Sequence, residues 1–96
     1  MTVQLTLRQT AVVRESLELL VEKIRREERE VLERLEGIAE RLGLRDWREL
    51  EDVFREGGPD NPELDLLWPE YMYLRGRLED LEKRRREAEE LLERLG

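Results

Sequence analysis

Apolar residues recur at alternating intervals of four and three positions in two long stretches of the chain. The first stretch places them at Leu17, Val21, Ile24, Val31, Leu35, Ile38 and Leu42. The second places them at Tyr71, Leu74, Leu78, Leu81, Ala88, Leu92 and Leu95. This spacing forms one apolar stripe along a helix and is typical of helices that pack as a coiled coil. The pattern therefore predicts an all-α protein built on a long antiparallel helical hairpin.

Each stripe is interrupted once by a charged residue, Glu28 in the first and Arg85 in the second. If Leu42 lies level with Tyr71, paired residue numbers add up to 112 or 113 at every layer, and Glu28 meets Arg85. A lone charge in an apolar seam is strongly unfavourable, whereas a matched pair largely offsets its own desolvation. We therefore predict that this pair sets the register of the hairpin against slipped alignments.

The first nine residues have a different period. Val3, Leu5 and Leu7 alternate with polar residues, as in a half-buried strand. The sequence predicts an extended arm over residues 1–9, either lying loosely on the helices or paired as a strand with a second copy.

Residues that begin or end helices set the remaining boundaries. Thr10 is the expected N-cap of a first helix over residues 10–42, and Gly43 is its expected stop. A short connecting helix over residues 46–56 is expected to start with a capping box between Asp46 and Glu49. Its apolar face consists of Trp47, Leu50, Val53 and Phe54.

Gly57 and Gly58 end the short helix and open a loop that runs to Pro62. Asn61 and Pro62 are a good N-cap and first-turn pair for a last helix over residues 62–95. Pro69 either starts that helix or kinks it, because proline cannot donate the backbone hydrogen bond of an interior position.

A two-helix hairpin buries only one stripe on each helix, so apolar residues beside the stripes need another cover. The short helix covers one end of the hairpin and cannot reach the other. We expect a homodimer that completes a four-helix bundle. The candidates for its dimer face are Leu20, Leu32, Met72 and Leu91.

All five aromatic residues fall in the middle of the chain, at Trp47, Phe54, Trp68, Tyr71 and Tyr73. One interpretation is structural, since aromatic side chains would fill the corner where the short helix folds back. The other is functional, because Trp and Tyr dominate the energetics of protein interfaces. These five residues are therefore the candidate partner-binding site.

Composition narrows the chemistry. The chain has no Cys and no His, so it lacks thiolate ligands, the commonest metal ligand and the usual general base. We expect no enzyme activity, no metal or cofactor and no small-molecule ligand.

The net charge of −7 opposes binding to nucleic acid or an anionic membrane. No apolar run is long enough to span a membrane, and we expect a cytoplasmic protein. Abundant Glu and Arg with few amides suit a thermophile.

The middle of the chain, over residues 40–82, resembles small helical antitoxin-like or partner-subunit proteins of archaea and thermophilic bacteria. The residues that carry the resemblance are Leu42-Gly43-Leu44, Trp47, Leu50, Glu51, Phe54, Gly57, Trp68, Tyr71, Leu74, Leu78 and Leu81-Glu82. The resemblance implies a non-enzymatic protein that binds and neutralises, or assists, another protein.

Two alternatives remain open beside that function. One is a purely structural helical module that associates with itself. The other is a ribbon-helix-helix repressor, in which paired N-terminal strands enter the DNA major groove. Thr2, Gln4, Thr6 and Arg8 would then face the groove, although the acidic chain and the long first helix argue against it.

Overall fold

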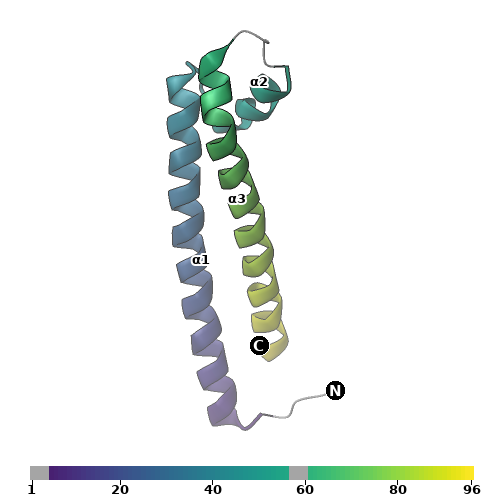
Figure 1. Cartoon of the computed structure of the whole chain (residues 1–96). Helices are drawn as coiled ribbons and strands as arrows, with labels where there is room; N and C mark the ends of the chain where they lie inside the picture. Colours follow the sequence, from purple (N-terminus) through teal and green to yellow (C-terminus); the bar gives the residue numbers. More distant parts are fainter. Residues whose placement is uncertain (1–4, 57–60) are drawn as a thin grey trace.

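The computed structural model describes residues 5–56 and 61–96, and within these ranges it contains helices and turns but no strand. Two long helices, α1 (Leu7–Arg41) and α3 (Pro62–Leu95), run antiparallel and side by side (Figure 1). They form a rod whose principal extents are 62 × 24 × 18 Å. The predicted all-α hairpin of two long helices is therefore confirmed.

Between the long helices, a 3-10 turn named η1 (Trp47–Glu49) leads into the short helix α2 (Leu50–Glu56). Figure 1 shows α2 beside the end of the hairpin where the chain passes from α1 to α3. We call this the connecting end, and the end near the two termini the open end.

α1 begins earlier than predicted, at a capping box between Thr6 and Gln9. The Thr6 hydroxyl accepts the Gln9 backbone N–H at 3.1 Å, and the Gln9 side chain accepts the Thr6 N–H at 3.0 Å. Thr10 donates its own N–H to the Thr6 carbonyl at 2.8 Å, so its prediction as the N-cap was wrong. The box satisfies two backbone donors that a helix start otherwise leaves unpaired.

The predicted extended arm over residues 1–9 is consequently too long, because its last three residues belong to α1, while Thr6 is extended. Leu7, Arg8 and Gln9 are helical, and Leu5 and Thr6 form no strand. Residues 1–4 lie outside the described residues. Three alternating apolar positions are a weak strand signal, and the reciprocal bonds of the capping box outweigh it.

α1 ends at Arg41 in a Schellman motif centred on Gly43, as the glycine predicted. The N–H of Gly43 donates to the Glu40 carbonyl at 3.0 Å, and the N–H of Leu44 donates to the Ala39 carbonyl at 2.9 Å. Gly43 has a φ of 75°, a left-handed conformation that glycine adopts without a steric penalty. The motif turns the chain toward η1.

The expected capping box at the start of the short helix is not formed. The Asp46 carboxylate instead accepts the backbone N–H of Arg48 at 2.9 Å, and this bond lowers the pKa of Asp46. Glu49 donates its N–H to the Asp46 carbonyl at 3.1 Å, which closes a 3-10 turn rather than an α-helical one. The predicted helix over 46–56 is thus one 3-10 turn followed by α2.

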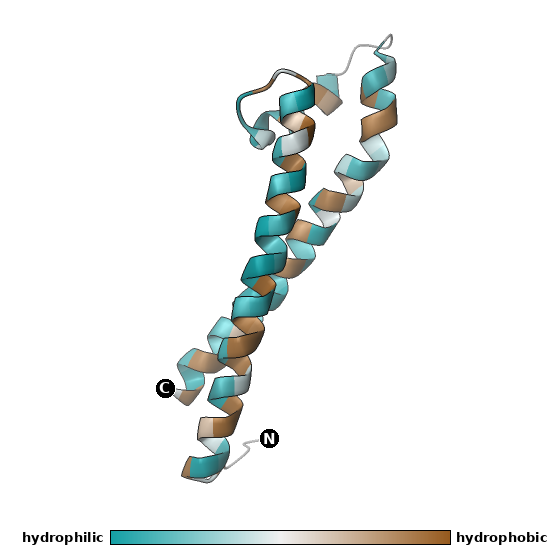
Figure 2. Ribbon diagram, turned by 90° about the vertical axis from the view of Figure 1, so that its left-hand side faces the viewer, coloured by the Kyte–Doolittle hydropathy of each residue, from teal (hydrophilic) through white to brown (hydrophobic). Residues whose placement is uncertain are grey.

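α3 begins at Pro62, with Asn61 as N-cap accepting the Glu63 N–H at 3.1 Å. Pro69 lies inside α3, so it does not start the helix. An interior proline removes one backbone hydrogen bond and bends the helix axis. Figure 2 shows that the part of α3 nearest the connecting end runs at an angle to the rest.

The core is the seam between α1 and α3 together with Leu50 from α2. Its buried residues are Ile24, Val31, Leu35, Ile38, Ala39, Leu50, Leu67, Tyr71, Leu74, Leu78 and Leu81. Leu67, only 4 % exposed, extends the stripe of α3 one step beyond Tyr71. Toward the open end, Leu17, Val21, Leu92 and Leu95 are only partly buried.

The alignment of the two helices differs from the predicted one. Arg14 donates to the Leu95 carbonyl at 2.8 Å, whereas the prediction placed Leu95 beside Leu17. In an antiparallel pair of helices, the residue numbers of two residues at the same level add up to a constant. For the polar contacts between α1 and α3, the two residue numbers add up to between 104 and 114. These sums average about 108, below the predicted 112 to 113. In a coiled coil each side chain fits between facing residues of the other helix rather than level with one of them. Figure 1 shows α1 extending past the end of α3 accordingly.

Glu28 and Arg85 nevertheless meet, because this alignment puts them in neighbouring layers. The Arg85 Nε atom donates to Glu28 Oε1 at 2.7 Å, and the side chains are 19 % and 12 % exposed. Helical side chains lean toward the N-terminus of their helix, so in an antiparallel pair these two lean toward each other. A slip of one heptad in one direction separates the two residues by about 16 Å along the axis. A slip of one heptad in the other direction makes their side chains lean away from each other.

The pair belongs to a chain of four charges. Arg85 also donates to Glu89 at 3.2 Å, and Glu89 accepts from Arg25 at 2.9 Å. The hydrogen bond to Glu28 is the main factor that raises the pKa of Arg85, so its guanidinium stays charged. Two cations and two carboxylates therefore balance one another, with Glu28 and Arg85 in the seam and Glu89 and Arg25 at its exposed edge.

We predict that Arg85→Leu lowers the free energy of unfolding by about 3 kcal/mol, because it leaves Glu28 with no partner in an apolar seam. Adding Glu28→Leu to that variant is expected to restore at least half of the loss. Arg25→Leu is the control, since it breaks an exposed pair with Glu89 and costs less than about 1 kcal/mol. Urea unfolding followed by circular dichroism measures all three, and additive losses in the double variant would refute the coupling.

Candidate partner-binding site

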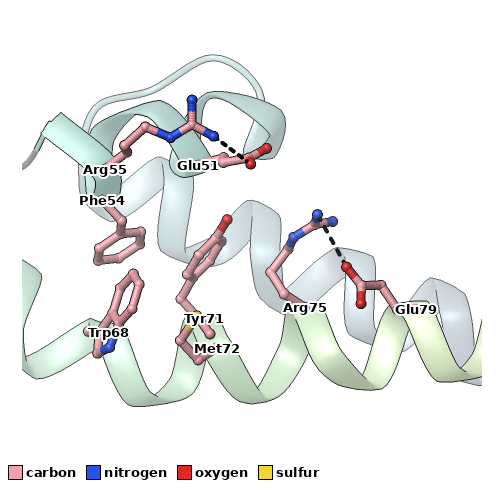
Figure 3. A pocket seen from close by; sticks show the side chains of 8 residues that line it. All are labelled: Glu51, Phe54, Arg55, Trp68, Tyr71, Met72, Arg75 and Glu79. Carbon is pink, nitrogen blue, oxygen red and sulfur yellow. Dashed lines mark hydrogen bonds and ion pairs between the residues drawn. The ribbon is translucent and has the colours of Figure 1, made fainter.

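Three of the five aromatic residues meet at the connecting end, between α2 and α3. Phe54 reaches from α2 toward Trp68 and Tyr71 on α3, as Figure 3 shows. Its ring stacks on Tyr71 with a centroid separation of 4.6 Å and tilts against Trp68 at 5.4 Å. Such pairs add to the stabilisation from apolar burial, so this aromatic cluster fastens α2 to α3.

The aromatic cluster forms the floor of a surface hollow of about 350 Å³, which we call the aromatic groove. It is lined by Glu51, Phe54, Arg55, Trp68, Tyr71, Met72, Arg75 and Glu79. Trp68 remains 44 % exposed and Met72 49 % exposed. The groove therefore presents large apolar side chains to solvent.

Two ion pairs border the aromatic groove, one from each helix (Figure 3). Arg55 lies 2.9 Å from Glu51 on α2, and Arg75 lies 3.8 Å from Glu79 on α3. Both pairs join residues four apart on one helix, a spacing that brings their side chains together. The groove thus has an apolar floor with a charged, paired border.

Trp47 lies outside the groove and has a different environment. It is partly buried against the core, and the guanidinium groups of Arg48 and Arg75 lie 5.3 and 5.8 Å from its ring centroid. Cations at these distances are attracted to the face of an indole ring. Trp47 therefore supports η1, and Arg75 connects it with the groove border.

Tyr73 also stands apart from the aromatic cluster. It is 61 % exposed and lines a separate hollow of about 260 Å³ with Glu27, Arg34 and Arg77 among its neighbours. That hollow is rimmed by the ion pair between Arg77 and Glu27, at 3.0 Å. The five predicted partner-binding residues thus divide into a groove, a supporting Trp47 and an isolated Tyr73.

The four candidates for a dimer face do not form one surface. Leu20 and Leu91 are 37 % and 47 % exposed and lie near the open end. Met72 instead borders the aromatic groove, and Leu32 is partly buried against the core. Along the first part of α1, further exposed apolar residues are Leu7, Val12, Val13 and Leu19. Exposed apolar side chains therefore occur at both ends of the rod.

The phenol of Tyr71 is one of the ionisable groups that line the groove. Burial raises the pKa of Tyr71, so its phenol is neutral at physiological pH.

Among residues 5–56 and 61–96, no group of three or more acidic side chains is placed to hold a metal ion. Neither long helix in these ranges has an apolar stretch that could cross a membrane.

Comparisons of the chain with protein-family models, with curated proteins and with solved structures found no match.

The sequence pattern singled out the aromatic floor but missed the groove border. Glu51, Arg55, Arg75 and Glu79 carried a usable signal, since both pairs have the four-residue spacing of helix ion pairs. What the pattern lacked was the packing angle of α2, which brings a pair on α2 opposite a pair on α3.

We predict that Phe54→Ala lowers the free energy of unfolding by about 2 kcal/mol, because the ring is half-buried between Trp68 and Tyr71. Trp68 fluorescence should also shift to longer wavelength as water reaches the ring, measured in a Trp47→Phe background. Met72→Ala is the matched control, with a change within about 0.5 kcal/mol, since that side chain lies at the exposed edge. Equal effects of the two substitutions would contradict the described packing.

Proposed function

We propose that this chain is a non-enzymatic protein-binding module that holds a partner protein in the aromatic groove. The observation that carries the proposal is Trp68, a half-exposed indole resting on the stacked rings of Phe54 and Tyr71. An exposed tryptophan with a rigid aromatic support is a typical anchor of a protein interface. Its ordering costs little when a partner binds, because the rings already pack together.

The groove border supports a protein partner. Interface anchors are commonly ringed by contacts that exclude water while contributing little energy themselves. Paired charges such as Glu51 with Arg55 and Arg75 with Glu79 suit that role. An antitoxin-like or accessory subunit, as the resemblance over residues 40–82 implies, acts through such a surface.

The open end supports a second candidate function, self-association into a homodimer. The first turns of α1 extend past the end of α3, so α3 does not cover them (Figure 1). Leu7 is 92 % exposed there, and Val12 is 59 % exposed. The same ends of two copies placed side by side would bury these residues in a four-helix arrangement.

The DNA-binding alternative finds no support in the described residues. Its predicted strand would place Thr6 and Arg8 in the major groove. Thr6 is the N-cap of α1 and Arg8 lies in its first turn, so neither stands on a strand face.

Native mass spectrometry of the tagged protein, purified gently from its source cells, tests the proposal. We expect a stoichiometric second protein, retained by the wild type and by Tyr73→Ala but lost by Trp68→Ala. The two substitutions are matched, because each removes one exposed aromatic ring from α3. Circular dichroism melts check that both variants remain folded.

Two other results of this experiment would contradict the proposal or move the binding site. A homo-oligomeric mass with nothing else retained would contradict the partner-binding function and favour self-association. A second protein that Trp68→Ala retains and Tyr73→Ala loses would move the site to the hollow beside Tyr73.

A further inference from the structure

The acidic side chains of the sequence are concentrated in the segment that joins the two long helices. Residues 46–70 carry nine acidic and two basic side chains, a net charge of −7 that equals the charge of the whole chain. The remaining residues carry 16 acidic and 16 basic side chains and are neutral overall. Arg34 and Arg41 of α1 neutralise part of this charge, and the connecting end, where the aromatic groove lies, retains an excess of acidic side chains.

Part of this negative charge has no internal partner. Four carboxylates of the segment are paired, namely Asp46 with Arg48, Glu51 with Arg55, Glu63 with Arg41 and Glu70 with Arg34. Within the described part of the chain, Glu49, Asp52 and Glu56 form no ion pair and are exposed. They recur at intervals of three and four on η1 and α2, so they share one exposed face of α2, which adjoins Arg55 and lies outside the lining of the aromatic groove.

We propose that the occupant of the aromatic groove is a cationic segment of a partner protein, with one or two large apolar side chains flanked by Lys or Arg. This inference rests on the proposed function and names the chemistry of the partner. The apolar side chains insert beside Trp68 and Met72, and the flanking cations face Glu49, Asp52 and Glu56. An acidic segment would meet uncompensated like charge there.

Charge complementarity and apolar anchoring have separate effects on such a complex. Unpaired surface carboxylates raise the rate of encounter with a cationic partner and reject anionic ones, and salt weakens this contribution. The apolar contacts provide most of the affinity and resist salt. The two contributions can therefore be tested independently.

The test uses two synthetic amphipathic peptides with the same leucine face, one with lysines and the other with glutamates on its polar face. Binding is followed by NMR through the indole N–H signals of Trp68 and Trp47. We expect the lysine peptide to shift the Trp68 signal and to bind at least about tenfold more tightly than the glutamate peptide. Raising salt from about 0.05 to about 0.5 M should reduce this preference.

Two charge variants serve as a matched pair. The triple variant Glu49→Gln, Asp52→Asn and Glu56→Gln is expected to bind the lysine peptide several-fold more weakly. The control Glu87→Gln, Glu90→Gln and Glu93→Gln removes the same charge from the open end and should leave binding unchanged. Equal weakening by both variants would mean that only the net charge of the chain matters, and would overturn the proposal.

Three further results would also overturn it: equal affinity for the two peptides, binding that leaves the Trp68 signal unmoved, or binding of neither peptide. Failure here is distinguishable from failure of the proposed function. A second protein that co-purifies through Trp68 and is unaffected by the Glu49, Asp52 and Glu56 substitutions would keep the partner-binding function and remove the cationic partner.

Discussion

The hydrogen bond between Glu28 and Arg85, 2.7 Å long within an otherwise apolar seam, is the contact that we propose selects the alignment of the two long helices. Apolar stripes of four-three spacing fit together equally well after a slip of one heptad, so leucines alone do not select one alignment. The charged pair does, because only one alignment makes the two side chains lean toward each other. That alignment places Trp68 and Tyr71 next to α2.

Much of the fold could be predicted from the sequence, because helix periodicity and end signals are local. The Asn61-Pro62 start, the Gly43 stop and the two stripes all have local causes. The predicted alignment was off by about half a heptad. It assumed that each apolar residue lies level with one residue of the other helix, whereas a coiled-coil side chain packs between facing residues. The Glu28–Arg85 contact was still anticipated, since both alignments keep the two residues within reach. The start of α1 was missed although Thr6 and Gln9 carried its signal.

The candidate site was less predictable, because its shape depends on how three elements pack. The aromatic residues cluster in the sequence, but this clustering could not separate Phe54, Trp68 and Tyr71, which meet, from Tyr73, which lies elsewhere.

The two ends of the rod differ in their chemistry. The connecting end combines exposed aromatic rings with an excess of acidic side chains, and the open end exposes aliphatic residues. This asymmetry favours different occupants for the two ends.

The central claim, that the Glu28–Arg85 pair determines the alignment, is most directly tested by a distance measurement between spin labels on α1 and α3. The chain has no cysteine, so labels attach only at introduced positions, such as Glu22→Cys toward the open end and Asp65→Cys at the connecting end. Both positions are exposed, and their separation lies mainly along the rod, so a slip along the axis changes it directly. Dilution with unlabelled protein limits the signal to distances within one chain. We predict one narrow distance for the wild-type pair and, after Glu28→Leu with Arg85→Leu, a second population displaced by about 10 Å, the length of one heptad. A single unchanged distance in that variant would contradict the account.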